Sequence, residues 1–172
     1  MTLGDGVLAE HDTGQETRLL DRIDRRILRA LQEEGRLTNV ELARRVGLSP
    51  TPCLERVRRL ERAGYITGYR AVLAPAKLDA ALLAFVQVTL DRTTPDAFEQ
   101  FRAAAAARPE VLECHMVAGG FDYLLKVRVR DMAAYRHFLG ETLTAIGGIA
   151  QTHTYVVMEE VKSDGPLPIA RG

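Results

Sequence analysis

The sequence has no long hydrophobic run, which argues against a membrane span. Its longest apolar stretches, such as Ala80–Val86, fall well short of the roughly 20 residues that cross a bilayer. The start of the chain also lacks a basic segment leading into an apolar one, as an export signal would have. We therefore expect a cytoplasmic protein.

Cysteine is scarce as well. Cys53 and Cys114 lie far apart, each within an apolar pattern. This is the usual setting of buried free thiols in a reducing compartment, so we expect both in the core.

Recognised catalytic and metal-binding motifs are missing. The four histidines, which show no zinc-like spacing with the cysteines, are His11, His115, His137 and His153. His115 follows Cys114, and neighbours on a strand point to opposite faces. The chain also has no nucleophile elbow, no phosphate loop and no carboxylate pair in a known catalytic motif. We expect no enzyme activity, metal or cofactor, although a triad assembled only in space leaves no such trace.

The formal net charge of the chain is zero, but the charged residues are unevenly distributed along it. Residues 21–70 hold twelve arginines against seven acids. Residues 1–20 hold one arginine against four acids, and residues 71–172 hold ten basic residues against twelve acids. One basic segment on a neutral chain indicates that a single module contacts a polyanion.

Two helices are predicted after an irregular start. Residues 1–19 show no sustained period, so we expect a flexible tail there. The apolar spacing then predicts a helix over residues 21–34, which Gly35 would end. Thr38 suits the N-cap of a second, short helix that ends at Gly47.

A third helix is predicted over residues 50–63. Ser49 suits its N-cap and Pro50 its first turn. The segment 65–73 is either a short strand pair or a linker. Residues 20–73 therefore form a predicted helix-turn-helix domain with its linker.

The third helix is a candidate for insertion into the major groove of DNA. Its outer face is predicted to be polar and mostly cationic, with Thr51, Glu55, Arg58, Arg59 and Arg62 on it. The candidates for contacts with base edges or phosphates are Asn39, Arg44, Arg45, Ser49, Thr51, Pro52, Glu55, Arg56, Arg58, Arg59 and Arg62. The alternatives are an ordinary solvated bundle and a helix-turn-helix that binds only protein. The arginine bias favours DNA.

Residues 78–162 change to a strand-like period and predict a second domain. The expected strands are 83–90, 111–117, 123–129 and 149–161, and the expected helices are 95–108 and 132–143. This βαββαβ order predicts a ferredoxin-like α+β domain, with an antiparallel sheet and both helices on one face. Residues 163–172 are expected to be a flexible tail.

The third helix and its surroundings resemble the Lrp/AsnC family of transcription regulators. The motif is Ser49-Pro50-Thr51-Pro52-Cys53-Leu54-Glu55-Arg56-Val57-Arg58-Arg59-Leu60-Glu61, and the likeness continues through Phe121-Asp122-Tyr123-Leu124-Leu125-Lys126 and Thr154-Tyr155-Val156-Val157-Met158-Glu159-Glu160. It covers residues 20–162 and is strongest toward the leucine-responsive branch. The resemblance implies a winged helix-turn-helix, a ferredoxin-like effector domain, dimers built through the sheets, and octamers.

The resemblance also implies an amino-acid effector, leucine in this branch, bound between αβ domains of neighbouring dimers. The matching positions are Met116, Val117, Gly119, Gly120, Phe121, Asp122, Tyr123, Met132, Tyr155, Val156 and Val157. A carboxylate such as Asp122 suits an ammonium group, backbone N–H groups at Gly119 and Gly120 suit a carboxylate, and apolar neighbours suit the side chain. From the residues alone, the glycines could instead form a hairpin turn with positive φ, and Asp122 could stabilise that turn.

One position departs from the family pattern. An acidic residue usually follows the first glycine of this turn, but Gly120 stands there. The effector could therefore be another amino acid, with genes of amino-acid catabolism as targets. A more distant alternative is a small metabolic enzyme or an enzyme-regulating subunit, since ferredoxin-like domains serve both roles.

Overall fold

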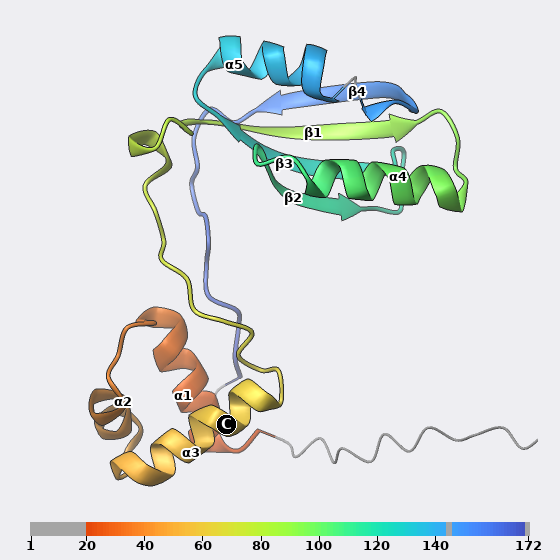
Figure 1. The fold of residues 1–172 in the computed structure, drawn as a ribbon. Helices are drawn as coiled ribbons and strands as arrows, with labels where there is room; N and C mark the ends of the chain where they lie inside the picture. The colour runs from red at the N-terminus through yellow and green to blue at the C-terminus, as the bar shows by residue number, and fades with distance from the viewer. Residues whose placement is uncertain (1–19, 144–145, 171–172) are drawn as a thin grey trace, which may run out of the picture. The chain divides into compact units, whose positions relative to one another are not determined.

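The computed structural model describes residues 20–143 and 146–170. These residues form two compact units, one running to Arg70 and joined by the segment after Ser163, and the other lying within Ala71–Ser163. Each unit is described by itself (Figure 1). The expected N-terminal tail, residues 1–19, lies outside the described residues.

The first unit is built from three helices, α1 (Arg22–Glu33), α2 (Asn39–Val46) and α3 (Pro50–Arg62). The N-termini of α1 and α2 each have a capping box, formed by Asp21 with Asp24 and by Thr38 with Glu41. Reciprocal bonds of this kind satisfy backbone N–H groups that have no partner within the helix.

The turn from α2 to α3 depends on Gly47. Its φ of 75° and ψ of 41° lie in the left-handed region, which glycine adopts without steric cost. The turn brings α3 back over α1 and α2, where Ile27, Val46, Cys53 and Leu60 are buried in one core. This confirms the predicted helix-turn-helix and the burial of Cys53.

Two local expectations around α3 are resolved by the structure. Ser49 occupies the N-cap, but its side chain makes no capping hydrogen bond. Residues 65–81 contain no strand, so the segment 65–73 is a linker rather than a strand pair, followed by a short 3-10 helix, Pro75–Lys77.

The segment after Ser163 belongs to the first unit. The Leu167 N–H donates to Gln32 Oε1 at 2.8 Å, and Gln32 Nε2 donates to the Leu167 carbonyl oxygen at 3.3 Å. Ile169 packs against the helical core. These contacts attach the part of the segment around Leu167 and Ile169 to the helical unit, and the flexibility expected for residues 163–172 stays a prediction.

The second unit has the expected βαββαβ order. Its strands are β1 (Leu82–Leu90), β2 (Val111–Met116), β3 (Tyr123–Val129) and β4 (Ile149–Val156). Its helices are α4 (Pro95–Ala106) and α5 (Met132–His137), the latter continuing into the π-helical segment Phe138–Leu143. The sheet order is β2-β3-β1-β4 with every pair antiparallel, which confirms the ferredoxin-like prediction.

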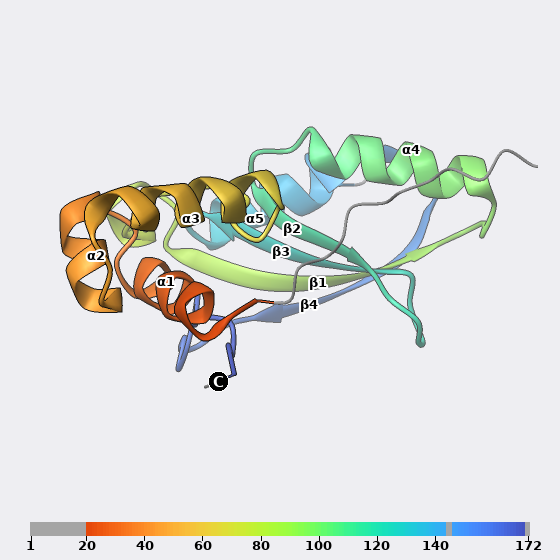
Figure 2. The same cartoon turned by 90° about the horizontal axis from the view of Figure 1, so that it is seen from below.

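Both helices pack on one face of the sheet (Figure 2). Alternate residues such as Val86 in β1 and Leu125 in β3 point into that core, where they meet Phe101 of α4 and Tyr135 of α5. Cys114 packs against this core, whereas His115 on the next position of β2 is exposed, as the alternation predicts.

The last strand is shorter than the sequence pattern predicts. The pattern extends to Val161, but β4 ends at Val156. The Val157 N–H still bonds to the Leu83 carbonyl oxygen, and β1 begins only one residue earlier, so the chain beyond has no strand beside it. Met158 and Val161 are accordingly almost fully exposed. No helix in the described residues is long and apolar enough to span a membrane.

Candidate nucleic-acid interface and effector site

The exposed side of α3 carries the expected polar and cationic residues. Thr51, Glu55, Arg58 and Arg62 are exposed and share the side opposite the buried Cys53 and Leu60. Neither Arg58 nor Arg62 makes a hydrogen bond or ion pair within the described residues, so both guanidinium groups are available to a partner. An α-helix with this face fits the major groove, with phosphates in reach of its arginines.

The side chains of Arg56 and Arg59 point toward α1 and not to the exposed side of α3. Both reach α1, where Asp24 Oδ1 accepts hydrogen bonds from Arg56 at 2.8 Å and Arg59 at 2.6 Å. Arg56 also pairs with Asp21. Asp24 is only 2% exposed, so the arginines neutralise a buried carboxylate. The expectation that Arg59 belongs to the outer face is therefore wrong, because its partner lies 35 residues away and local periodicity cannot reveal it.

Asp21 and Asp24 are residues that the sequence interpretation missed. Burial raises the pKa of the Asp21 carboxyl, but the Asp24 N–H and the Arg56 guanidinium lower that pKa by more. The same hydrogen bond to Asp21 raises the pKa of Arg56. The available signal was the Asp-x-x-Asp pattern at the start of the first helix, which predicts a cap but not its pairing with α3.

The candidates on α2 are also partly engaged. Asn39 Nδ2 donates to the Pro50 carbonyl oxygen at 2.8 Å and so joins the starts of α2 and α3. Arg45 pairs with Glu34, while Arg44 is exposed. Pro52 is half-buried in the first turn of α3. Asn39 thus has a positioning role that the sequence did not indicate.

In the second unit, the turn between β2 and β3 is fixed by Asp122. The Asp122 N–H donates to the Val88 carbonyl oxygen, and its own carbonyl oxygen accepts from the Val117 N–H, both at 3.0 Å. Its carboxylate accepts a hydrogen bond from the Leu90 N–H at 2.8 Å. Asp122 therefore ties the turn to the end of β1, and among the described residues its other carboxylate oxygen has no donor.

Gly119 and Gly120 are exposed in this turn, and neither has a φ in the left-handed region. A Cβ at either position would meet no atom within 4 Å. The alternative of a hairpin that requires positive φ at these glycines is therefore wrong. A side chain at position 120 is therefore sterically acceptable. Compared with the acidic residue that is usual in the family, Gly120 removes a negative charge from the turn without being required by its fold.

The predicted effector residues fall at two ends of the sheet. Met116–Tyr123 surround the β2–β3 turn beside the Val88–Leu90 end of β1. Tyr155 and Val156 pair with Phe85 and Ala84 near the other end of β1.

Val157 and Met132 belong with this second group. Val157 bonds to Leu83, and Met132 starts α5 just after Val129, the partner of Leu82. The stretch of strand from Leu83 to Val88 spans about 17 Å. The described part of one chain therefore does not gather these residues into one pocket.

Within the described residues, no group of three or more His, Cys, Asp and Glu side chains is placed to hold an ion. The geometry supports recognition: a cationic helix for a polyanion, and a turn with a carboxylate and exposed backbone for a small zwitterion.

Comparison with known proteins identifies the two domains that carry these candidate sites. Residues 20–67 match a family model described as a winged helix-turn-helix DNA-binding domain, and residues 83–167 match the Lrp/AsnC ligand binding domain. The leucine-responsive regulatory protein of Salmonella typhimurium is 64% identical over 150 residues, which cover 87% of this chain and 92% of that protein. The chain belongs to the Lrp/AsnC family.

Solved structures of Lrp/AsnC-like regulators extend the likeness. A transcriptional regulator from Neisseria meningitidis in complex with L-Met has a TM-score of 0.83 and 44% identity, covering 87% of this chain and 96% of that one. An AsnC family regulator from Agrobacterium tumefaciens has a TM-score of 0.82 and 36% identity, covering 87% and 97%.

This Lrp/AsnC chain is a transcription regulator with an N-terminal DNA-binding domain and a C-terminal ligand-binding domain. The relatives named above are likewise described as regulators.

Proposed function

We propose that this protein is a cytoplasmic, leucine-responsive regulator that acts as a homo-oligomer, in dimers and octamers. The observation that carries the proposal is the 64% identity to a leucine-responsive regulatory protein across both units. Leucine binding would change how αβ units of neighbouring chains pack, and thereby the spacing of the paired DNA-binding units.

On the DNA side, the exposed residues of α3 make the contacts. Thr51 and Glu55, near the N-terminus of α3, face base edges, while Arg58 and Arg62 bind phosphates or guanine edges. The Ser49 hydroxyl makes no capping bond and so remains able to bind a phosphate. Arg44 and Arg45 add phosphate contacts from α2, and Pro52 lies against the groove.

Asn39, Arg56 and Arg59 act at the same interface by holding α3 in place. Asn39 fixes the start of α3 through Pro50, and the two arginines fix its middle through Asp24. Their replacement would weaken DNA binding because α3 would no longer be held in its orientation, in addition to any direct contact.

On the effector side, the ligand lies between chains. The turn Gly119–Tyr123 supplies the free oxygen of Asp122 for the ammonium group and exposed backbone for the carboxylate. The apolar group at the other end of the sheet comes from a neighbouring chain; it consists of Met132, Tyr155, Val156 and Val157. Met116 and Val117 flank the turn, and their separation from the second group is what favours a shared site.

Two observations favour an effector other than leucine as the alternative. Gly120 removes a possible acidic partner from the turn, and the Neisseria regulator was solved with L-Met. Methionine is unbranched and flexible, so it suits an apolar pocket of similar volume. The alternative proposal is a regulator of this family that responds to methionine or another apolar amino acid.

The experiment is a gel shift of the purified protein on DNA upstream of its own gene, at fixed salt, with leucine or methionine. We expect a shift that leucine alters. A shift altered by methionine and not by leucine selects the alternative, and a shift unaffected by either contradicts both leucine and methionine as the effector. A DNA affinity that does not fall with salt would contradict the phosphate contacts.

A further inference from the structure

The chain passes between its two units twice. It leaves the first unit after Arg70 and returns to it after Ser163. The outgoing segment, residues 71–81, leads to β1, and the return segment, residues 157–163, follows β4. Within one chain, a change in the second unit can therefore reach α3 along the backbone only through these two segments.

Arg128 of β3 bonds to both segments. Its neighbours Val127 and Val129 point into the core, so its side chain lies on the face of the sheet opposite the helices. There Arg128 Nη1 donates to the Ala80 carbonyl oxygen of the outgoing segment at 3.3 Å, and Nη2 donates to Glu160 Oε1 of the return segment at 2.5 Å. The side chain of Arg128 is only 11% exposed, which limits the screening of these bonds by salt. The Arg128 clamp, formed with Ala80 and Glu160, thus fixes the two segments to the same point of the sheet.

Each segment has a further fixed point near this clamp. In the outgoing segment, the Ala80 N–H donates to the Pro75 carbonyl oxygen at 3.1 Å and closes the turn before β1. In the return segment, the Val157 N–H donates to the Leu83 carbonyl oxygen at 2.9 Å. Leu83 is also the register partner of Arg128. The start of the return segment therefore follows the end of the sheet that carries Arg128.

The clamp lies at the end of the sheet that holds the proposed apolar effector group. Val157, a member of that group, bonds to the residue that pairs with Arg128, and Glu160 follows it by three residues. Three extended residues span about 10 Å, so little chain separates the group from the clamp. Met132, another member, follows Arg128 by four residues at the start of α5. An effector bound to Val157 therefore acts on a part of the chain that the clamp fixes.

The return segment leads to α1 by the shorter route between fixed points. Leu167 forms two hydrogen bonds with Gln32 of α1. Seven residues lead from Glu160 to Leu167, at most about 25 Å of extended chain. On the outgoing side, the Tyr69 hydroxyl donates to α3 at 3.0 Å, and the eleven residues from Tyr69 to Ala80 extend to about 40 Å. The return route has less chain in which a displacement can be absorbed, so it transmits a displacement more directly.

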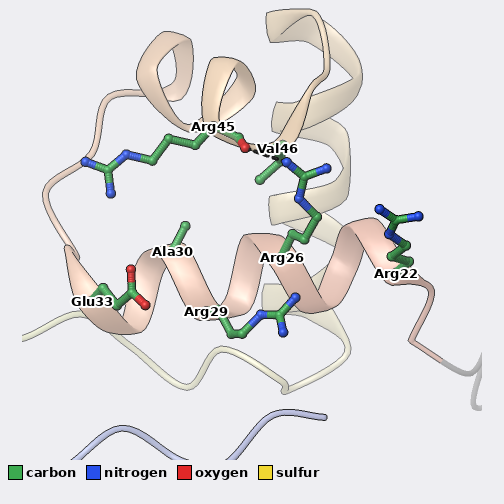
Figure 3. Close-up of a pocket in the computed structure, with 7 residues that line it drawn as sticks. All are labelled: Arg22, Arg26, Arg29, Ala30, Glu33, Arg45 and Val46. Carbon is green, nitrogen blue, oxygen red and sulfur yellow. Dashed lines mark hydrogen bonds between the residues drawn. The ribbon is translucent and has the colours of Figure 1, made fainter. Parts of the chain in front are cut away.

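α1 carries such a displacement to the recognition helix. Asp24 Oδ1 of α1 accepts a hydrogen bond from Arg59 of α3 at 2.6 Å. Arg26 of α1 donates to the Arg45 carbonyl oxygen of α2 at 2.7 Å, as the dashed line in Figure 3 shows. These bonds and the shared core join α2 and α3 to α1. A pull on Gln32 of α1 therefore reorients α3 together with the rest of the first unit.

We propose that the Arg128 clamp transmits the effector response from the second unit to the DNA-binding unit. With the clamp in place, movement of the sheet end around Val157 displaces both segments together, and the return segment passes the movement to α1. Without the clamp, the segments are no longer fixed to the sheet and absorb the movement themselves. The proposal rests on the proposed function, because it assumes an effector at this end of the sheet.

Arg128→Gln in the full-length protein tests the clamp. The operator affinity without leucine and the leucine affinity from calorimetry should each stay within about twofold of the parent, because the variant removes coupling and not a binding contact. The change that leucine makes in operator affinity should fall below about twofold, from the roughly 5–150-fold that allosteric coupling usually gives. Methionine takes the place of leucine if it is the amino acid that alters DNA binding by the parent.

A second variant, Glu160→Ala, separates the two halves of the clamp. It keeps the bond from Arg128 to Ala80 and should lose only part of the coupling. The double variant should behave like Arg128→Gln alone, because both changes remove the same contact.

The matched control is Lys126→Gln. Lys126 lies two residues before Arg128 on the same face of the sheet, and it donates to Glu113 at 2.9 Å rather than to either segment. The control removes the same charge and should keep the parent's response to leucine. Sedimentation velocity compares the oligomeric mass of each variant with that of the parent.

The proposal is overturned if Arg128→Gln responds to leucine as the parent does, or if Lys126→Gln loses the response equally. A loss that accompanies weaker leucine binding or a changed oligomeric mass also overturns it. If Arg128→Gln does not fold, an unchanged response in Glu160→Ala contradicts the clamp. A parent that responds to neither amino acid contradicts the proposed function, and the role of the clamp fails with it, whereas a responsive parent with a responsive Arg128→Gln contradicts the clamp alone.

Discussion

The two units distribute their proposed contact residues differently. In the helix-turn-helix unit, Thr51, Glu55 and Arg58 share one side of a single helix, and the surface is complete within one chain. In the αβ unit, Asp122 lies beside Leu90, while Tyr155 pairs with Phe85 toward the other end of β1. A site on one helix is fixed by local sequence, whereas a divided site is completed only by assembly.

The units also use charge differently. In the first, two arginines of α3 neutralise the buried Asp24 and so connect the recognition helix to α1. In the second, pairs such as Glu113–Lys126 lie on the exposed face of the sheet. The fully buried carboxylate Asp24 thus makes charge part of the core of the first unit, whereas the Glu113–Lys126 pair of the second lies outside its core.

Asp24→Asn should have the largest effect and sharpens this contrast. It leaves two arginines without their buried counter-charge, which costs about 3 kcal/mol of unfolding free energy, the lower end for a broken buried pair. Hydrogen exchange should show reduced protection in α1 and α3, with β1 and β3 unchanged. The control Glu99→Gln breaks the exposed pair with Arg102 and should cost less than about 0.5 kcal/mol. Similar protection in both variants would refute the structural role of Asp24.

Asp122→Asn tests the divided site with the turn preserved. The amide oxygen can still accept from the Leu90 N–H, but the charge for the ammonium group is gone. Leucine affinity measured by calorimetry should fall by about tenfold or more, since charge-assisted bonds contribute roughly 1.5–3 kcal/mol. Asp122→Ala should additionally lower the thermal stability of the αβ unit. Unchanged leucine affinity in the Asn variant would leave Asp122 with only its turn-stabilising role.

Arg58→Ala and Arg62→Ala test whether the first site is complete on α3. Each should weaken operator binding severalfold and reduce the slope of log K against log salt by about 0.9 for each phosphate that is no longer neutralised. Stability should not change, because neither side chain has a partner among the described residues. Arg92→Ala, an exposed arginine of the other unit, serves as the control. An equal weakening in Arg92→Ala would point to overall charge rather than to the α3 face.

Glu113→Gln should have the smallest effect. Hydrogen bonds from Lys126 and then His115 lower the pKa of the Glu113 carboxyl. A lowered pKa contributes stability at pH values above the ordinary glutamate range, and this contribution is lost as pH falls through the folded value. As the pH falls from 6 to 3, the melting temperature of the parent should fall slightly more than that of the variant. The difference in unfolding free energy behind it should stay within about 0.5 kcal/mol, because the Glu113 carboxylate is half-exposed. Glu159 makes no ion pair with the described residues, so Glu159→Gln should show the same pH dependence of melting temperature as the parent.

Much of the fold could be predicted from local pattern. Capping residues, Gly47 and alternating strands predicted the three helices and the order of elements in the αβ unit, because each signal acts over a few residues. The end of β4 was missed because it depends on where β1 begins. On the site, the exposed side of α3 follows from helical period, but the pairing of Arg59 with Asp24 joins residues distant in sequence. The separation of Asp122 from Tyr155 likewise follows only from strand register.

The most direct test of a shared effector site is complementation between two variant chains. Asp122→Asn disables the turn, and Met132→Asp places a charge at the exposed apolar position of the other group. Each variant alone should bind leucine weakly. Co-refolded chains should recover part of the leucine binding, because some interfaces then join an unaltered turn to an unaltered apolar group. Binding in the mixture no greater than in the separate variants would contradict a site built from two chains.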